Sequence, residues 1–272
     1  MIEDRIIVEI LNYGPAFLLI AVRALAMIET APLLSSDAIP QTAKIALAGF
    51  AAFSVMPAVP SLPPGQDLFS ISFLLLLIGE GIIGIIMGFF LLVIFSAFST
   101  AGQFFSLQMG FGASETFDPL SQVENPLLGQ YLNLVAMLVF LSIGGFRELF
   151  LGGFWRSLQS LSVTALIAGR EEILSILLSG LTRLFLDAII ISMPILGTLF
   201  LTSLATGLIS KAAPQINILS EGFPISITVA FLLIFLTMPF MVEAFSRVIE
   251  TGFSSVQTLY TQIGRQIEGA GL

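Results

Sequence analysis

Histidine and cysteine are absent from the 272-residue sequence. Without them the chain has no disulfide, no thiolate or imidazole metal ligand, and no catalytic group of either type. Zinc proteases, haem proteins and cysteine hydrolases are therefore excluded. The sequence also lacks a nucleotide-binding loop, a serine-based triad and a cluster of metal-ligating side chains. We expect no cofactor, no metal and no enzymatic activity.

Charged residues are scarce. They make up 10% of the chain, against about 25% in ordinary soluble domains, and the mean hydropathy is +1.02. The net charge of −8 is spread over the polar segments and includes no basic stripe, so we expect lipid and not nucleic acid as a partner. This composition indicates a polytopic integral membrane protein.

Long charge-free runs define the expected helices. The longest covers 81–114, and four others of 21 to 23 residues cover 45–66, 125–146, 188–210 and 222–242. A membrane-spanning helix needs about 20 residues. We predict an all-α membrane protein with about six long hydrophobic helices in hairpins, kinked by proline, at residues 6–31, 41–58, 68–110, 126–146, 174–210 and 222–247. The third would be about 60 Å long if continuous, so part of it must leave the bilayer, kink or be enclosed by protein.

Small residues recur along one face of this third helix. Residues of this size let helix backbones approach closely. We therefore predict that the face packs against other helices and does not meet lipid; its members are Gly81, Gly84, Gly88, Gly102, Ser106 and Gly110.

Among the charged residues within expected helices, three are candidate functional groups. Glu80 stands beside the small-residue face, and a carboxylate in an apolar helix is a functional candidate by default. It is a proton carrier, a group paired with another residue, or a residue at the end of the span, and no matching titratable residue forms a relay. Arg183 and Asp187 are four residues apart, so we expect them to neutralise each other.

Three polar or amphipathic segments interrupt the apolar pattern. Residues 110–126 contain two glycines, two prolines, three acids and two phenylalanines, and an exposed loop gains little from the phenylalanines. Two further segments carry apolar residues on one helical face, which would either cap a bundle or lie on lipid. They are residues 147–161 and the tail 250–272, with Phe253, Val256, Tyr260, Ile263 and Ile267 on the apolar face.

Two sequence blocks carry a family resemblance. The first is Leu107-Gln108-Met109-Gly110-Phe111, followed by Asp118-Pro119 and by Pro126 at the start of a hydrophobic helix. The second is Gly207-Leu208-Ile209-Ser210-Lys211-Ala212-Ala213-Pro214-Gln215, followed by Gly222-Phe223-Pro224 and Pro239. Both resemble the FliR family of the flagellar type III secretion export gate and its virulence counterpart, SctT. The motifs cover about residues 80–239, and the length and hydropathy profile fit throughout.

The resemblance implies a single membrane domain, residues 1–272, in a hetero-oligomeric ring with FliP-like, FliQ-like and FlhB-like subunits. This ring is the channel through which unfolded flagellar proteins cross the bacterial inner membrane at the flagellar basal body. Residues matching the family's channel plug are Met109, Gly110, Phe111, Gly112, Glu115, Phe117, Asp118 and Pro119. Relatives often carry apolar residues where this chain has Ser114-Glu115-Thr116, which puts the tightness of the plug in question.

Three alternatives remain. One is a secondary transporter for a small solute, which would use broken helices and polar groups near the membrane midplane. Another is the virulence branch of the same family. The last is a structural scaffold of a membrane complex, favoured if the 110–119 segment proves dispensable.

Overall fold

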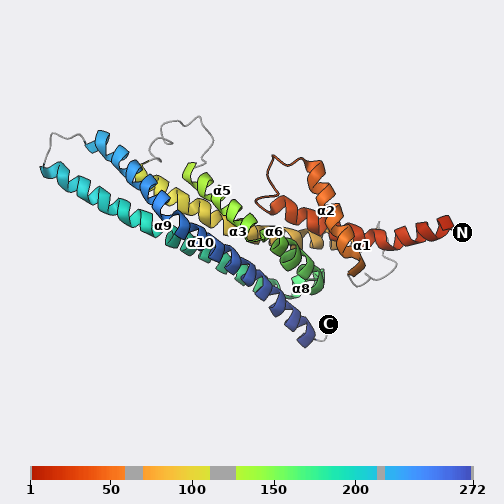
Figure 1. Ribbon diagram of the computed structural model, residues 1–272. Coiled ribbons are helices and arrows are strands. Elements are labelled where there is room, and N and C mark those ends of the chain that lie inside the picture. The colour runs from red at the N-terminus through yellow and green to blue at the C-terminus, as the bar shows by residue number, and fades with distance from the viewer. Residues whose placement is uncertain (1, 59–69, 111–126, 213–217, 271–272) are drawn as a thin grey trace. The chain divides into compact units, whose positions relative to one another are not determined.

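The computed structural model describes residues 2–58, 70–110, 127–212 and 218–270. In these ranges all regular structure is helical and no strand occurs (Figure 1), which confirms the predicted all-α class. Six longer helices and several short ones follow one another along the chain. The longer ones are α1 (Ile2–Thr30), α2 (Gln41–Val55), α3 (Ile71–Met109), α5 (Leu127–Ser142), α9 (Arg170–Ala212) and α10 (Ile218–Ala270).

The described part of the structure contains about six long helices, as predicted, and fewer of them are long and apolar enough to span a membrane. Among the described residues, four helices are long and apolar enough, or five if α5 and residues 145–160 form one broken span. The difference lies mainly in α2, whose 15 residues reach only about 23 Å, short of a hydrocarbon core of about 30 Å. The second hydrophobic segment is thus a helix of the bundle and not a span by itself.

The ends of several helices follow from local chemistry. Gly110 adopts φ 86°, a left-handed conformation that suits glycine, and ends α3. Gly144 (φ 74°) separates α5 from a run of short helices. These are α6 (Gly145–Arg147), the π-helical η2 (Glu148–Trp155), α7 (Arg156–Ser160) and α8 (Val163–Ala168), and the 3₁₀ turn η1 (Met56–Ala58) follows α2.

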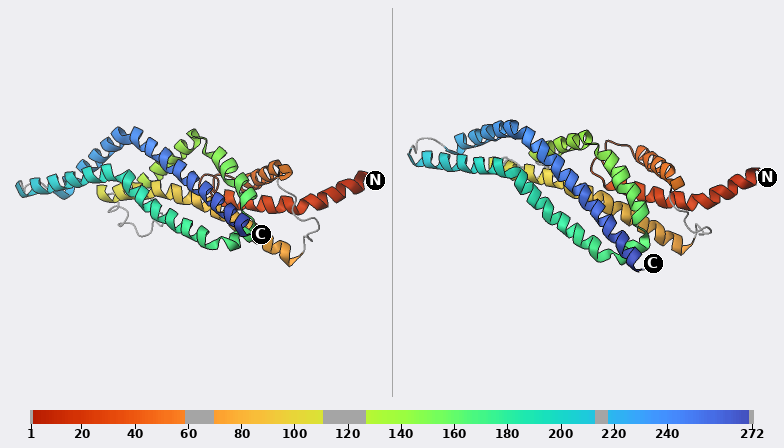
Figure 2. Two further views of the ribbon diagram at one scale, coloured as in Figure 1. Left: turned by 90° about the horizontal axis from the view of Figure 1, so that it is seen from below. Right: turned by 60° about the horizontal axis from the view of Figure 1, so that its bottom comes forward.

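Proline lies inside the longest helices. Pro194 is within α9, and Pro224 and Pro239 are within α10. Figure 2 shows both helices bent along their length, as expected where a proline removes a backbone hydrogen bond. Threonine hydroxyls in α9 donate to carbonyls four residues earlier, as Thr198 does to Pro194 (2.9 Å). These hydroxyls are therefore satisfied within the helix, even in apolar surroundings.

The chain folds into two compact units, with α3, α9 and α10 contributing to both. Unit 1 comprises Met1–Leu92, Gly144–Gly180 and Thr251–Leu272. In it α2 packs against α1 (Figure 1). Phe154 and Leu161 of the amphipathic stretch 147–161 are fully buried, while Leu151 on the same predicted face is exposed. This stretch therefore contributes to the core of unit 1 and is not simply a lipid-facing surface.

The C-terminal tail is part of α10 and not a separate element. Its residues Val256, Leu259 and Tyr260 are buried in the core of unit 1. The described part of the predicted amphipathic face is thus covered by protein.

Unit 2 comprises Val93–Ile143 and Leu181–Glu250. Its core contains a group of phenylalanines from α3, α5 and α10. The rings of Phe95 and Phe140 lie 5.6 Å apart edge to face, and those of Phe98 and Phe245 lie 4.4 Å apart. Such pairs add to the free energy of burial and fix side-chain orientation.

Candidate functional site

The most extensive polar contact in unit 1 surrounds Arg23 of α1. Its side chain is 2% exposed, and its Nε donates to the Glu80 carboxylate of α3, itself 14% exposed. One terminal nitrogen donates to Ser157 Oγ (3.2 Å), and the other to the Leu161 carbonyl oxygen (2.9 Å). We call Arg23, Glu80, Ser157 and the Leu161 carbonyl the Arg23 cluster. Glu80 is therefore an ion-paired group.

Two further polar groups belong to the surroundings of the Arg23 cluster, the Phe154 carbonyl and the Tyr260 hydroxyl. Ser157 also donates to the Phe154 carbonyl (2.7 Å), so its hydroxyl has both a donor and an acceptor role. Tyr260 of α10 lies near Arg23 and interacts with it electrostatically. The Tyr260 hydroxyl is buried and has no hydrogen-bond partner among the described residues. The Arg23 cluster thus joins α1, α3 and α7, with α10 beside it.

Glycines bring α3 close to α1 next to this cluster. A methyl group added at Gly84 would overlap the Arg23 carbonyl and Ala26 Cβ. One added at Gly88 would overlap Thr30 Oγ1 and approach the Met27 carbonyl. At Gly81 it would meet Val22 at an ordinary 3.6 Å. Gly84 and Gly88 are therefore the positions where the two backbones leave no room for a side chain.

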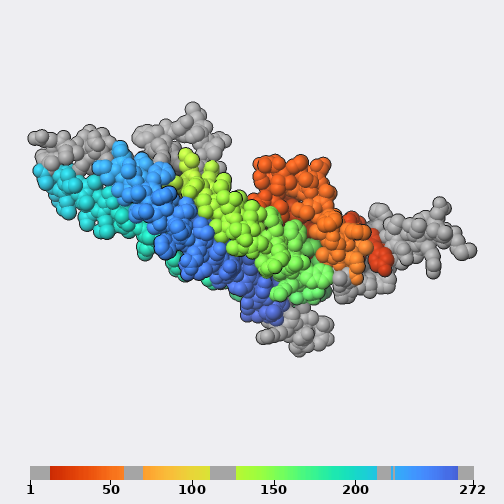
Figure 3. Space-filling view, in the orientation of Figure 1, coloured from red at the N-terminus to blue at the C-terminus, as the bar shows by residue number. Residues whose placement is uncertain are grey.

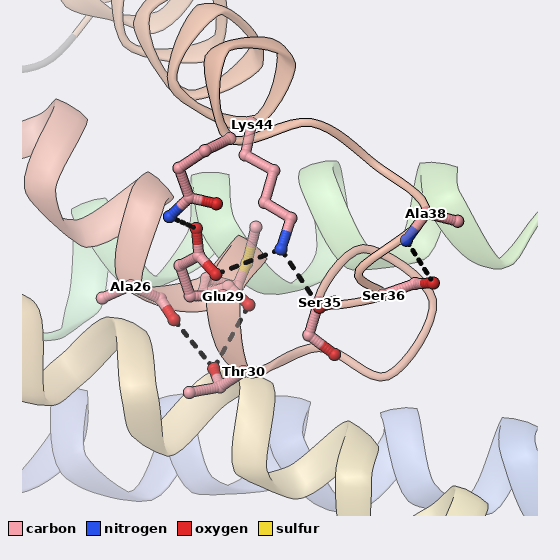
Figure 4. Close-up of polar contacts among 9 residues, drawn as sticks. Ala26, Glu29, Thr30, Ser35, Ser36, Ala38 and Lys44 are labelled. Carbon is pink, nitrogen blue, oxygen red and sulfur yellow. Dashed lines mark hydrogen bonds and ion pairs between the residues drawn. The ribbon is translucent and has the colours of Figure 1, made fainter.

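A second polar cluster in unit 1 closes the turn between α1 and α2. Lys44 is 5% exposed, and its Nζ donates to Glu29 Oε2 (3.2 Å) and to the Ser35 carbonyl (3.0 Å), as Figure 4 shows. Thr30 Oγ1 donates back to the Ala26 carbonyl (2.8 Å). These contacts hold α2 beside α1 without contacting the Arg23 cluster.

In unit 2, α3 meets α5 at another glycine. A methyl group at Gly102 would lie 2.5 Å from Gly129 Cα and 2.6 Å from Gly129 N. Ser106 and Met109, one and two turns further along, are 4% and 1% exposed. These last turns of α3, up to Gly110 where the predicted plug segment begins, are therefore covered by protein on one face, while Leu107 on another face is 67% exposed.

The predicted pair in α9 forms within unit 2. Arg183 Nε lies 3.6 Å from Asp187 Oδ2, with the arginine half exposed and the aspartate 16% exposed. Glu243 and Arg247 of α10 form a similar pair at 3.6 Å, with both side chains exposed. Asp187 and Glu243 thus each have a nearby cation on their own helix.

Large apolar side chains cover the outer surface of unit 2. Phe235 and Phe240 of α10 are 77% and 71% exposed, and Figure 3 shows this part of α10 with its outer face uncovered by the rest of the chain. An apolar groove of about 810 Å³ lies between α5 and α10, with Leu128, Tyr131 and Pro239 in its lining. Such a surface is unsuited to water and must face lipid or another protein.

Several residues of the predicted family motif and plug do not form a site in the described part of the structure. Lys211 and Pro224 are exposed near the ends of α9 and α10, and Gly222 lies in the first turns of α10. Phe223 is within α10, but its side chain lies outside the described residues. Phe111, Gly112, Glu115, Phe117, Asp118, Pro119, Pro214 and Gln215 lie outside the described residues as well.

Sequence reasoning missed the partners of Glu80. Arg23 interrupts the first hydrophobic segment, yet it lies 57 positions from Glu80, and no local pattern links them. One general rule could have pointed to Arg23. A buried carboxylate needs a cation beside it, and this chain has few cations to offer. Nothing in the sequence indicated Ser157 or the Leu161 carbonyl. In the described part of the chain, no group of acidic side chains is arranged to hold a metal ion.

Comparison with known proteins identifies the family. The family model of the bacterial export proteins, family 1, matches residues 15–252. The flagellar biosynthetic protein FliR of Bacillus subtilis is 29% identical over 261 residues, which cover 94% of this chain and 98% of the relative.

Two other relatives agree with this match. FliR of Escherichia coli is 33% identical, covering 80% of this chain and 82% of its own. FliR of Borreliella burgdorferi is 33% identical, covering 73% and 74%. The resemblance of the sequence motifs is confirmed, and the chain, with its long apolar helices, belongs to the bacterial export proteins, family 1, the family of the flagellar protein FliR.

Proposed function

We infer that the chain is a non-enzymatic subunit of the flagellar type III secretion export gate in the bacterial inner membrane. The observation that carries this is the family match, which extends over residues 15–252 and leaves little of the chain outside it. The relatives are named as flagellar proteins, which favours the flagellar over the virulence branch. The gate would pass unfolded flagellar proteins across the membrane.

The expected partners are FliP-like, FliQ-like and FlhB-like membrane subunits. The uncovered apolar faces of α9 and α10 support this, since helices of partner subunits would bury side chains such as Phe235 and Phe240. Pro194 within α9 and Pro239 within α10 also suit a protein surrounding, because neighbouring helices can satisfy the carbonyls that prolines leave free.

The segment from Met109 to Pro119 is the proposed channel plug. Gly110, with its left-handed conformation, ends a helix whose last turns bury Ser106 and Met109, so the chain leaves α3 at a defined point. In this proposal the phenylalanines of the segment exclude water, and its glycines let it swing aside for a passing chain.

A complementation experiment tests this function. Cells lacking the gene would be supplied with the full chain, and secreted flagellar subunits and swimming would be measured. We expect both to return. The matched control is the chain with Gly84 and Gly88 replaced by leucine, which keeps the coding length but forces α1 and α3 apart. Swimming and secretion that do not depend on the gene would contradict the proposal.

A further inference from the structure

The short-helix segment (residues 145–168) depends on outside contacts for its position. Residues 145–160 form one uninterrupted run of α6, the π-helical η2 and α7, and the six-residue α8 follows. A helix as short as α8 is marginal in isolation, and π-helical stretches such as Glu148–Trp155 are rare. Tertiary contacts must therefore decide how this segment lies in unit 1.

Two of the apolar contacts of the segment are made through glycine. A methyl group at Gly79 of α3 would lie 2.5 Å from Val163 Cγ1, and one at Gly153 would lie 3.5 Å from Met87 Cε. Contacts of this kind allow close approach but have no direction. In a membrane the lipid chains are as apolar as the helices, so burying apolar groups favours no single arrangement.

The Arg23 cluster makes directional contacts that the apolar residues cannot make, and these can select one arrangement of the segment. The guanidinium is planar and presents its donors in a fixed fork, and here each nitrogen points to a different acceptor: the Glu80 carboxylate, Ser157 Oγ and the Leu161 carbonyl. Two of these acceptors lie directly after the π-helical stretch. Any other placement of the segment would leave a buried cation or a helix-end carbonyl without these partners.

Stability alone gives no reason to keep such a pair. Replacing both members of a buried ion pair by apolar residues is often neutral or stabilising, whereas removing one is strongly destabilising. Buried pairs are best known for selecting one arrangement among several. We propose that the Arg23 cluster is a clasp that fixes the short-helix segment against α1 and α3 in one arrangement. Its role in export rests on the function proposed above.

A disulfide crosslink can report this arrangement, because the chain contains no cysteine. Gly79→Cys with Val163→Cys places two thiols across the contact; a Cβ at Gly79 would lie 3.2 Å from Val163 Cβ, close to the 3.5–4.5 Å found in disulfides. The full chain would be expressed with its partners, and membranes would be oxidised. Protection of both thiols from maleimide labelling measures the crosslink.

Two variants test the clasp. Arg23→Met with Glu80→Met removes both charges, and Arg23→Lys keeps the charge but loses the three-way fork. We expect the crosslink to fall several-fold in each. The lysine variant keeps the test valid if the double variant does not accumulate. The control is Glu29→Leu with Lys44→Met, which removes the other buried ion pair of unit 1 and should leave the crosslink unchanged.

A wild-type crosslink in Arg23→Lys, or in the double variant, overturns the proposal. An equal fall in the control also overturns it, since any lost ion pair would then have the same effect. The crosslink needs no export readout, so failure of the clasp and failure of the export-gate assignment are separate results.

Discussion

At the scale of single residues, the effect of a glycine in a helix depends on what surrounds it. Gly84 and Gly88 lie against the backbone and side chains of α1, whereas Gly197 of α9 has no atom within 4 Å of an added methyl group. The same residue type therefore marks a tight helix contact in one place and open space in another.

This contrast predicts opposite effects of alanine. Gly84→Ala should destabilise the protein by about 1–3 kcal/mol, because the Arg23 carbonyl belongs to a helix backbone that cannot move aside. Gly197→Ala should stabilise it by about 0.5–1 kcal/mol through lower backbone entropy in the unfolded chain. Gly81→Ala, at ordinary contact distance, should fall between. Thermal unfolding midpoints of the purified complex in detergent measure this, and equal midpoints for Gly84→Ala and Gly197→Ala would contradict it.

The Arg23–Glu80 pair predicts a non-additive cycle. Glu80→Leu alone leaves a buried cation unpaired and should cost about 3–5 kcal/mol. Adding Arg23→Met should recover much of that loss, because the double variant buries no charge. The same thermal midpoints are the measurement. A double variant that is less stable than both single variants would show that the two residues act independently.

At the scale of elements, the sequence was most informative where the pattern is long. The charge-free runs located α3, α5, α9 and α10, because no soluble helix needs so many consecutive apolar residues. The small-residue pattern suggested a helix contact at Gly84 but not that α1 is the partner. The π-helical stretch Glu148–Trp155 was not foreseen, since its apolar pattern also fits an α-helix.

Chain-distant contacts explain most of what remained hidden. Arg23 meets Ser157 across 134 positions, and only the packing of several helices brings them together. The groove beside Tyr131 and Pro239 likewise arises from two helices far apart in sequence. The pattern of neighbouring residues in the sequence does not predict such contacts.

The proposed plug predicts a leak. Deleting Gly112–Phe117 should leave the complex assembled but permeable to small ions, because Gly112, Phe117 and the four residues between them are missing from the proposed plug. The remaining acids, Asp118 and Glu124, should favour cations in the leak. Conductance of the purified complex in a planar bilayer is the measurement. The control is deletion of Ser61–Gln66, which removes six residues elsewhere. Equal conductance of the two deletions would make 112–117 an ordinary connecting segment.

At the scale of the whole molecule, the exposed apolar faces matter most. A solitary small-solute transporter would cover its helices with lipid and place polar groups at a central site. Here Glu80 is paired with Arg23 and Asp187 with Arg183, so these charges do not form a shared polar site. The family is also one of export proteins. The molecule is therefore best understood as one part of a larger membrane assembly.

The mass of the purified protein tests this account most directly. The chain, of 29.2 kDa, would be co-expressed with FliP-like and FliQ-like subunits, extracted in mild detergent and measured by native mass spectrometry. Expression without these partners is the control, in which we expect degradation or aggregation because the bends, glycine faces and apolar surfaces lack their neighbours. We predict one large assembly that contains all three proteins. A stable, monodisperse monomer that does not bind the co-expressed FliP-like and FliQ-like subunits would contradict the account.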